Sequence, residues 1–470
     1  MQLAVIVLAA GEGTRMRSNL PKVLHQIAGL PLISHVLSTA FSLSAEHVVT
    51  VLGHQKNLIS EYVTEHFPAT LVADQGSTPG TGAAVEAGLA ALPKEFKGEV
   101  LVLSGDVPLL DIASISELLE LHRGSANAAT LISTILDNPT GYGRILRSRD
   151  GLVGIIEQKD ASESDLAVTE VNAGVYVFDR NHLDKALASV TTRNSQGEKY
   201  LTDVISILLE QGQSAAAYPI TDHWLVAGIN DKKQLSEVAA ELNARIVKAW
   251  QLAGVTIIEP STTWIDVTCQ VGPDATLLPS TRLHGLTQVG TQATIGPDTT
   301  VTDSFIGAGA TVSRSQVSSA EILENASVGP FAFIRPGTVL GADGKIGAFV
   351  EVKNSIIGPS AKVPHLSYVG DSEIGEGANI GAGTIFANYD GVDKHRITIG
   401  AFARTGSSNT FVAPVTVGDG AYTAAGSTIR RNVESGALAL NEAAQKNLSG
   451  WVLANRPGSQ SAKAVNLDTE

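Results

Sequence analysis

The sequence predicts an α/β protein. A Rossmann-like N-terminal domain with a mostly parallel sheet is joined by a linker helix to a left-handed parallel β-helix. Three observations lead to this prediction. Residues 1 to about 228 alternate apolar, strand-like runs with helix-like segments. Residues 231–252 show one amphipathic pattern, and from about residue 255 a six-residue repeat replaces both patterns.

The N-terminal part contains apolar runs that predict strands, among them "LAVIVLAA", "HVVTVLG", "VLVLSGD" and "NAGVYVF". Helix-like segments such as "PLISHVLSTAFSL" and "SISELLELHRG" lie between these runs. Such alternation predicts βαβ units. Ligands of these sheets bind at the carboxyl ends of the strands, and "AAGEGTRM" and "SGDVP" each follow a predicted strand. We therefore expect the functional residues of this part at that edge.

The middle of the chain predicts one amphipathic helix. Its apolar side chains recur at spacings of three and four, at Leu235, Val238, Ala239, Leu242, Ile246 and Ala249. The predicted divisions are therefore an N-terminal domain at 1–230, a linker helix at 231–252 and a β-helix at 253–451. Residues 452–470 lack a packing pattern, so we expect a disordered tail.

The C-terminal part repeats the pattern [VI]-G-x-x-x-x, from "VGPDAT" at 271 to "VGDGAY" at 417. An aliphatic residue at every sixth position points into a prism, and the small residue after it permits a tight corner. Three such units make one coil, which predicts roughly ten coils. The segment "TIFANYDGVDKHR", residues 384–396, interrupts the repeat and predicts a functional loop on one side of the prism.

The composition excludes several classes of protein. A formal net charge of −14 over 470 residues argues against a nucleic-acid binder and against a protein of anionic membrane surfaces. The single cysteine, Cys269, rules out an internal disulfide framework. No stretch approaches the roughly 20 apolar residues of a membrane span, and the N-terminus lacks the basic region of a signal peptide. We expect a cytoplasmic protein without membrane insertion.

The loop "LAAGEGTRMRSNLPK", residues 8–22, is a candidate phosphate-binding loop. Gly11 and Gly13 let backbone N–H groups approach a phosphate, and Arg15 and Lys22 supply positive charge. The loop matches neither G-x-G-x-x-G nor the P-loop pattern. Asp106 in "LSGDVPL" follows an apolar strand, where a carboxylate is well placed for a hard cation. A turn-forming aspartate is the alternative interpretation of Asp106.

Motifs in both halves resemble one family. "LAAGEGTRMRSNLPKVLHQIAGLPL" is similar to the signature of sugar-1-phosphate nucleotidyltransferases. "FIRPGT", "GAFVEVKNS", "KVPHLSYVGDSEIGEGANIGAGT" and "NYDG" resemble the second half of the bifunctional N-acetylglucosamine-1-phosphate uridyltransferase / glucosamine-1-phosphate N-acetyltransferase family. The resemblance covers about residues 3–451. It implies acetyl transfer from acetyl-CoA to glucosamine-1-phosphate, followed by uridylyl transfer from UTP to N-acetylglucosamine-1-phosphate with release of pyrophosphate. The product serves peptidoglycan and other cell-envelope precursors.

For the uridyltransferase site the resemblance implies Mg²⁺ held by Asp106 and by Asn230 in "VAGIN". Arg15 meets the triphosphate and Lys22 the phosphates, and both are implied to be catalytic. The UDP-sugar would be bound by Leu8, Ala9, Ala10, Gly11, Lys22, Gln75, Gly80, Thr81, Gly143, Glu157, Asn172 and Asn230. Within this set, Gln75 and residues 80–82 read uracil, and Gly143, Glu157 and Asn172 hold the amino-sugar. The chain departs from the family at Glu12, Pro79 and Ala83, where lysine, leucine and histidine are more usual.

For the acetyltransferase site, His365 is the candidate general base because acetyl transfer needs a neutral amine. It comes two residues after the inward-facing Val363, at a coil corner. An ordinary surface histidine is the alternative. The resemblance implies that Asn388, beside the reacting centre, is also catalytic. It implies amino-sugar or acetyl-CoA contacts for Arg335, Lys353, Tyr368, Asn379, Ala382, Asn388, Tyr389, Ser407 and Ala425. Glu442 replaces an arginine that is usual in the family, and a glutamate there would repel a coenzyme A phosphate.

Two further expectations concern the β-helix. It resembles the prisms of obligate trimers, in which acyl sites form between neighbouring copies, so we expect a homotrimer. The alternative is a sugar-1-phosphate nucleotidyltransferase whose β-helix is only an oligomerisation scaffold. His365, Asn388 and the interrupting loop argue against that alternative.

Overall fold

The structure is a computed structural model that describes residues 2–149, 151–441 and 445–467. Glu442 lies outside the described residues. The chain forms two compact units. Unit 1 comprises Met1–Pro273 and Leu277–Thr287, and unit 2 comprises Asp274–Thr276 and Gln288–Glu470. Each unit is described by itself below.

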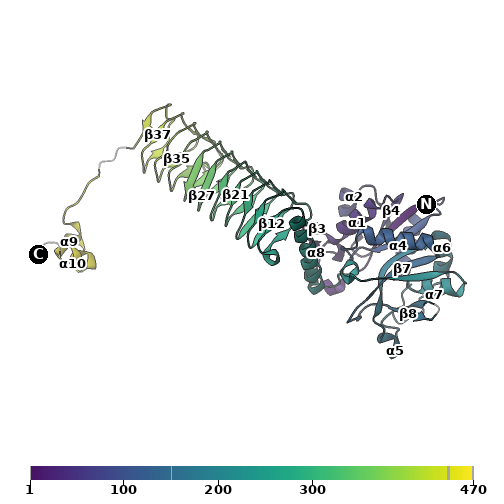
Figure 1. The fold of residues 1–470 in the computed structure, drawn as a ribbon. Coiled ribbons are helices and arrows are strands. Elements are labelled where there is room, and N and C mark those ends of the chain that lie inside the picture. The colour runs from purple at the N-terminus through teal and green to yellow at the C-terminus, as the bar shows by residue number, and fades with distance from the viewer. Residues whose placement is uncertain (1, 150, 442–444, 468–470) are drawn as a thin grey trace. The chain divides into compact units, whose positions relative to one another are not determined.

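Unit 1 is built on one nine-stranded sheet with the main order β11-β7-β10-β6-β1-β4-β5 (Figure 1). Strands β6, β1, β4 and β5 are parallel to one another, β11 is parallel to β7, and β10 runs antiparallel between β7 and β6. Strands β8 and β9 form an antiparallel hairpin beside β10. The bounds are β1 (Leu3–Ala9), β4 (His47–Leu52), β5 (Leu71–Asp74), β6 (Glu99–Ser104), β7 (Ala129–Ile135), β8 (Arg144–Ser148), β9 (Gly151–Ile156), β10 (Glu170–Asp179) and β11 (Ala215–Ile220).

Helices cover both faces of this sheet, which explains why β1 is an unbroken apolar run. Ala4 and Ile6 join one core with α3 (Thr81–Ala91), α6 (Arg180–Ser189) and α7 (Asp203–Glu210). The alternate residues of β1, such as Val5, join the opposite core with α1 (Leu32–Ser42), α2 (Lys56–His66) and α4 (Ile112–Gly124). The shorter elements of this part are β2 (Gln26–Ile27), β3 (Leu30–Pro31), α5 (Glu163–Leu166), η1 (Thr14–Met16), η2 (Lys22–Leu24) and η3 (His223–Val226).

One long helix, α8 (Lys232–Leu252), occupies the segment where the sequence predicts a linker helix. Asp231 caps its first turn by accepting a hydrogen bond from the Gln234 N–H at 2.9 Å. The buried Asn243 side chain donates to Thr263 O at 2.7 Å and accepts from Ile265 N–H at 3.1 Å. These bonds fasten α8 to the first coil of short strands within unit 1. That coil contains β12 (Thr256–Ile257), η4 (Pro260–Thr262), β13 (Trp264–Ile265) and β14 (Gln270–Val271), followed by β16 (Thr281–His284).

Unit 2 is a prism of stacked coils, and short parallel strands form its three sides (Figure 1). The first side holds β18 (Thr294–Ile295), β21 (Thr311–Val312), β24 (Ser327–Val328), β27 (Lys345–Ala348) and β30 (Lys362–His365), preceded by β15 (Thr276–Leu277). The second holds β19 (Thr299–Thr302), β22 (Gln316–Ser318), β25 (Phe333–Ile334), β28 (Glu351–Lys353), β31 (Tyr368–Gly370), β33 (Ile385–Ala387), β35 (Thr410–Val412) and β38 (Thr428–Ile429). The third holds β17 (Gln288–Val289), β20 (Phe305–Ile306), β23 (Glu321–Ile322), β26 (Val339–Leu340), β29 (Ile356–Ile357), β32 (Ser372–Ile374), β34 (Ile397–Ile399) and β36 (Val415–Val417).

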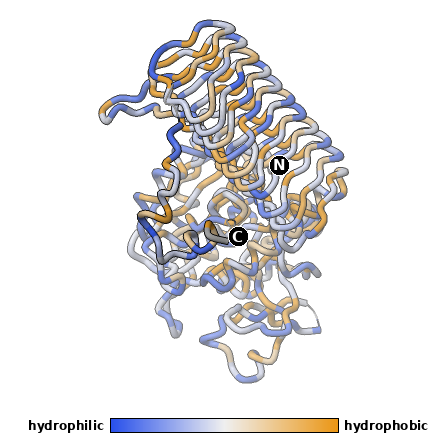
Figure 2. Tube along the Cα trace, turned by 90° about the vertical axis from the view of Figure 1, so that its left-hand side faces the viewer, coloured by the Kyte–Doolittle hydropathy of each residue, from blue (hydrophilic) through white to orange (hydrophobic). Residues whose placement is uncertain are grey.

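The six-residue repeat fills the interior of this left-handed parallel β-helix, as predicted. The repeat residues Ile295, Ile306, Ile346, Val363 and Val417 are fully shielded from solvent. Hydrophobic and hydrophilic stretches alternate along the coils in Figure 2. Because every coil repeats the same corners, residues about 17 or 18 positions apart stack directly on one another. The predicted fold class is therefore confirmed.

The end of the chain differs from the disordered tail expected from the sequence. After β37 (Tyr422–Thr423) and β39 (Leu438–Ala439), the described residues include α9 (Trp451–Asn455) and α10 (Gln460–Leu467). The Arg456 guanidinium lies over the Trp451 ring at 5.4 Å, and Ala462 is buried. These local contacts give the segment a packing pattern that its polar composition hides. Within the described ranges, no helix is both long enough and apolar enough to cross a bilayer.

Candidate active sites

In unit 1, three predicted residues from distant segments meet at the carboxyl edge of the sheet. The Lys22 ammonium pairs with Asp106 Oδ2 and lies 3.4 Å from Asn230 Oδ1. Asp106 follows β6, and its carbonyl accepts the Ile229 N–H at 3.0 Å, which brings the residue before Asn230 alongside. The side chains of Lys22 and Asp106 are only 14% and 19% exposed. A carboxylate oxygen and an amide oxygen thus converge on one cationic group.

The glycine-rich loop begins beside this cluster. β1 lies next to β6, and the Gly105 N–H donates to Leu8 O at 2.9 Å. Ala9 ends β1, and the carbonyl of Ala10 accepts the His54 N–H at 3.2 Å. Gly11 is exposed, and no atom lies within 4 Å of the place where a side chain would begin. The loop therefore has open space at the position expected to face a phosphate.

Arg15 lies in η1 and is exposed to solvent. Tyr142 was not identified from the sequence. Burial raises the pKa of the Tyr142 hydroxyl, and the charge of Asp106 raises it further, whereas a hydrogen bond with the Gly228 backbone and the charge of Arg15 lower it. Tyr142 thus lies near both Arg15 and the Lys22–Asp106 pair, and it immediately precedes Gly143. Nothing in its local sequence marks it.

A second group of predicted residues surrounds the start of α3. The Gln75 side-chain amide donates to Thr78 O at 2.9 Å and to Gly80 O at 3.1 Å. Both partners are carbonyls, so this orientation of the amide follows from the contacts. Thr81 Oγ1 accepts the Leu201 N–H at 3.1 Å. Gln75, Gly80 and Thr81 therefore form one structural loop, and the Gln75 carbonyl oxygen is left to meet a ligand.

Gly143, Glu157 and Asn172 form the third group. The Asn172 N–H donates to Gly143 O at 2.9 Å, and a side chain at Gly143 would begin 3.5 Å from Glu157 Oε1. Burial raises the pKa of the Glu157 carboxyl, a hydrogen bond from Thr202 lowers it, and nearby carboxylates raise it further. The Asn172 amide donates to the buried Tyr176 hydroxyl at 2.6 Å. The structure thus brings together the three residues that the resemblance assigns to the amino-sugar.

In unit 2, the backbones of His365, Ala382, Ser407 and Ala425 follow one another on successive coils, at one corner of the prism. We call these four residues the His365 column. The His365 carbonyl accepts the Gly383 N–H at 3.3 Å, which places Ala382 on the next coil above it. Ser408 N–H donates to Ala382 O at 2.7 Å and Gly426 N–H donates to Ser407 O at 2.8 Å, so the column continues through Ser407 and Ala425. His365 is exposed, and among the described residues nothing hydrogen-bonds to its ring. The predicted base and three predicted acetyl-CoA residues therefore share one edge.

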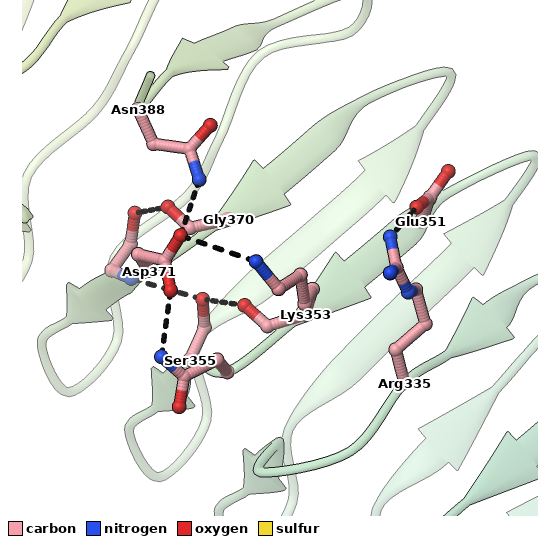
Figure 3. A network of polar contacts seen from close by, with 9 residues as sticks. Arg335, Glu351, Lys353, Ser355, Gly370, Asp371 and Asn388 are labelled. Atoms are coloured by element: carbon pink, nitrogen blue, oxygen red, sulfur yellow. Dashed lines mark hydrogen bonds and ion pairs between the residues drawn. The ribbon is translucent and has the colours of Figure 1, made fainter. Parts of the chain in front are cut away.

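A polar network occupies the side of the prism that carries β28 and β31 (Figure 3). The Asp371 carboxylate accepts hydrogen bonds from Asn388 and, at 2.6 Å, from Asn354, and it lies 3.5 Å from the Lys353 ammonium. Burial alone would raise the pKa of Asp371, but these hydrogen bonds and the Lys353 charge outweigh burial and lower it. Arg335 pairs with Glu351 at 2.7 Å on neighbouring coils.

Gly370 gives this network its close packing. It stacks on Lys353, one coil along. A side chain at Gly370 would begin 2.5 Å from the Tyr368 hydroxyl and 2.7 Å from the Asn388 amide nitrogen. Glycine is therefore required by the approach of these two groups, and not by its own backbone angles. Any side chain at this position would displace the Tyr368 hydroxyl or the Asn388 amide.

The interrupting segment, residues 384–396, contains a loop that is held by hydrogen bonds between its own residues. The Asp390 carboxylate accepts the N–H groups of Val392 and Asp393 and pairs with His395 Nε2 at 2.7 Å. These bonds hold the pKa of Asp390 well below its ordinary value, with the Asp393 backbone contributing most. His395 N–H in turn donates to Asn388 O at 2.7 Å. The loop is thereby closed against Asn388.

Two residues of this site were missed by the sequence interpretation. Lys394, on the loop, contacts Lys353, and that contact and the Lys353 charge lower the pKa of the Lys394 ammonium. Asp371 joins Lys353 to Asn388, as described above. Asp371 lies 18 residues after Lys353, about one coil, so the repeat period was a usable signal. Lys394 lies outside the repeat and had no such signal.

Two predicted residues stand apart from the network. The backbone of Asn379 pairs with the backbones of Lys362 and Arg404 on the side of the prism that carries His365. The exposed Tyr389 hydroxyl donates to Gly391 O at 2.7 Å, within its own loop. In this structure Tyr389 therefore points to neither the His365 column nor the Lys353 network.

The donor sets restrict the kinds of metal site. Within residues 2–149, 151–441 and 445–467, no three His, Cys, Asp or Glu side chains gather as a metal centre. Asp106 and Asn230 supply two oxygens that already face a cationic group. Such a pair fits a hard cation that takes its remaining ligands from phosphates and water.

Comparisons with known proteins identify relatives of the chain. The family model of the MobA-like NTP transferase domain matches residues 5–151. The bifunctional protein GlmU of Clavibacter sepedonicus is 54% identical over 464 residues, covering 98% of this chain and 94% of the relative. The GlmU proteins of Kineococcus radiotolerans and Mycobacterium bovis are 54% and 52% identical over 462 and 473 residues, covering 98% and 99% of this chain and 94% and 95% of the relatives. The chain therefore belongs to the GlmU family of bifunctional proteins.

Proposed function

We propose that the chain is a bifunctional enzyme of UDP-N-acetylglucosamine synthesis. It transfers an acetyl group from acetyl-CoA to glucosamine-1-phosphate and then the uridylyl group of UTP to N-acetylglucosamine-1-phosphate, releasing pyrophosphate. The product supplies peptidoglycan and other cell-envelope precursors. The observation that carries the proposal is that one chain presents polar groups suited to both reactions. Lys22 and Asp106 meet in unit 1, and unit 2 carries a network around Lys353 and an exposed His365 on a corner of the same prism.

In uridylyl transfer, an oxygen of the sugar phosphate attacks the α-phosphorus of UTP, and the bond to pyrophosphate breaks. The protein contributes position and charge stabilisation to such a transfer. The Lys22 ammonium, partly buried beside Asp106, stabilises negative charge on the phosphates. Arg15 on the adjoining loop does the same from the solvent side, and residues 8–11 offer their backbone. Asp106 and Asn230 would hold Mg²⁺, which neutralises phosphate charge when bound.

The nucleobase of UTP is recognised by the loop around Gln75. Both N–H groups of the Gln75 amide are used within the protein, so Gln75 Oε1 is an acceptor toward the ligand. Uracil presents an N3–H donor there, whereas cytosine presents a bare nitrogen. The geometry therefore supports UTP over CTP. Gly143, Glu157 and Asn172, joined by the contacts described above, support binding of the N-acetylamino-sugar.

In acetyl transfer, the amine of glucosamine-1-phosphate attacks the thioester carbonyl, its proton passes to a base, and the coenzyme A thiolate leaves. The exposed ring of His365 serves as that base. Ala382, Ser407 and Ala425 follow it along one corner, where small side chains leave room for an extended pantetheine arm. Arg335, Lys353 and Lys394 gather positive charge that suits the sugar phosphate. Tyr368 and Asn388, which lie beside Lys353, belong to the proposed amino-sugar site. Asn379 and Tyr389 are also proposed contacts of the amino-sugar, although they lie outside the Lys353 network in this structure.

We infer that the active form is a homotrimer. Phe331, Phe349 and Leu366 are 55%, 60% and 62% exposed, and the first two stack at 5.3 Å. Exposed apolar side chains on successive coils favour burial against another copy. Light scattering should give about three times the chain mass of 48.9 kDa. A monomeric mass at assay concentration would contradict the inference.

One reaction mixture tests the proposed function. The full chain is supplied with glucosamine-1-phosphate, acetyl-CoA, UTP and Mg²⁺, and UDP-N-acetylglucosamine is measured. Omitting acetyl-CoA should stop both steps, whereas omitting UTP should leave N-acetylglucosamine-1-phosphate. If added N-acetylglucosamine-1-phosphate is uridylylated but glucosamine-1-phosphate is never acetylated, the β-helix is only a scaffold.

A further inference from the structure

Residues 199–202 connect two parts of the first candidate site, the loop at residues 79–82 and Glu157. The Lys199 N–H donates to Pro79 O at 2.9 Å, and Lys199 O accepts the Gly82 N–H at 2.8 Å. The Leu201 N–H donates to Thr81 Oγ1 at 3.1 Å. Together these bonds clasp residues 79–82, the loop proposed to read the base, along its whole length.

The opposite end of the same segment touches the proposed sugar site. Thr202 Oγ1 donates to Glu157 Oε1 at 3.2 Å. The Tyr200 hydroxyl donates to Asp160 Oδ2 at 3.3 Å, and the Asp160 N–H donates to Glu157 O at 3.0 Å. Four consecutive residues therefore contact both the base loop and the carboxylate assigned to the amino-sugar.

The side chain of Thr202 faces Glu157 and not its own helix. Thr202 directly precedes α7, but its backbone angles are helical (φ −60°, ψ −30°), unlike those of a residue whose side chain caps a helix. Here the hydroxyl makes no capping bond and donates to Glu157 instead. Thr202 is buried, at 3% exposure, so water does not replace this contact. A buried hydroxyl that donates to the partly buried carboxylate of the proposed sugar site points to a positioning role in that site.

The Lys199 side chain contacts the helix that begins at the base loop, α3. The ammonium pairs with Glu86 Oε1 on α3 at 2.5 Å, and the side chain is only 13% exposed. Glu86 lies one turn beyond Thr81, so the ion pair ties the segment to the helix that begins at the base loop. The backbone bonds of Lys199 and this ion pair fix the same loop from two sides.

We propose that residues 199–202 form a bracket that holds the base loop and Glu157 in place, with Lys199 and Thr202 as positioning residues. Thr202 orients one oxygen of Glu157 so that the other is directed to a sugar hydroxyl, and Lys199 keeps residues 79–82 in register for the base. This inference rests on the proposed uridylyl transfer.

The test measures the KM for each substrate of the uridylyl transfer in full-length variants. Thr202→Val keeps the shape and removes the hydroxyl. A lost hydrogen bond to a charged group should raise the KM for N-acetylglucosamine-1-phosphate about tenfold, with the KM for UTP nearly unchanged. Thr202→Ser should restore the wild-type value. Lys199→Met should raise the KM for UTP about threefold and leave that for the sugar phosphate unchanged. Lys233→Met, which removes an exposed pair with Glu237 on α8, should change neither.

The outcomes separate the bracket from the proposed function. If the wild type forms no UDP-N-acetylglucosamine, the proposed function fails. If the wild type is active but Thr202→Val keeps both KM values, or raises both equally together with a lower melting temperature, the bracket is wrong and the function stands. Acetyl transfer by the same chains, which uses unit 2, reports whether a variant is folded and correctly quantified.

Discussion

The two candidate sites are assembled in opposite ways. In unit 1, Lys22 meets Asp106 and Asn230, which are 84 and 208 residues away in the sequence. In unit 2, Asp371 meets Lys353 and Asn388, which are 18 and 17 residues away. A parallel sheet gathers distant strand ends at one edge, whereas a β-helix repeats one corner every coil. Polar groups are thus brought together by long-range topology in one unit and by the sequence period in the other.

This difference has a consequence for sensitivity to substitution. The unit 1 cluster depends on single residues at loop ends, whereas the unit 2 network depends on how neighbouring coils pack. Because each site lies within one unit, each activity provides an internal control for damage to the other. The following substitutions test the comparison.

The largest loss of activity is expected when His365 or Asp106 is replaced by alanine. His365→Ala should lower acetyl transfer by about 10²–10⁴-fold, since it removes a general base, and leave uridylyl transfer intact. Asp106→Ala should lower uridylyl transfer by about 10²–10³-fold, since Asp106 is proposed to hold the Mg²⁺ that neutralises phosphate charge, and leave acetyl transfer intact. Separate assays of the two half-reactions measure both values. Intact acetyl transfer in His365→Ala would show that another group is the base.

Gly370→Ala should come next, because the new methyl group enters the space used by the Tyr368 hydroxyl and the Asn388 amide. Displacing these groups should reduce acetyl transfer about tenfold to a hundredfold, with uridylyl transfer unchanged. The measurement is kcat for each half-reaction in the same preparation. Wild-type acetyl transfer would mean that the close approach has no part in the reaction.

Asp371→Asn should have a smaller and more selective effect. The substitution keeps the shape of the side chain but removes the charge that holds Lys353 and Asn388. We expect kcat for acetyl transfer to fall about tenfold, because Asn388 is held less firmly. The KM for glucosamine-1-phosphate should not rise, because a negative charge next to the phosphate site has been removed. A rise in KM with constant kcat would contradict this account.

The smallest effect is a pH dependence of stability at the same residue. The pKa of Asp371 is lower in the folded chain than the value of about 3.9 expected when unfolded, so its ionised form stabilises the fold. That stabilisation is fully present above pH 4 to 5 and is lost as the pH falls through the lower folded pKa. The difference in unfolding free energy between the wild type and Asp371→Asn should therefore shrink on acidification. A constant difference from neutral pH downward would show that the carboxylate is not stabilised by its ionisation.

Much of the second site could be predicted from the sequence because its contacts follow the repeat. Once the six-residue period is found, residues one coil apart, such as Lys353 and Asp371, are expected to be neighbours. The interrupting loop was also visible as a break in that period. What the period does not describe is the path of the loop, so the approach of Lys394 to Lys353 appeared only in the structure.

Less of the first site could be predicted from the sequence. The sequence indicated that Lys22 belongs to the glycine-rich loop and that Asp106 and Asn230 lie at strand ends, but not that one ammonium contacts both oxygens. Tyr142 and Thr202 carry no local motif, and their roles come from burial and from partners far along the chain.

The sequence by itself determined the division into two architectures, the strand runs, the amphipathic helix and the inward residues of every coil, because these depend on periodicity over short windows. It also carried the motifs that mark the family. Only the tertiary structure decided which polar groups touch, which way the Gln75 amide points and where the Thr202 hydroxyl is directed. Such contacts depend on angstrom-scale packing between segments that are remote in the chain, and no short window of sequence contains that information.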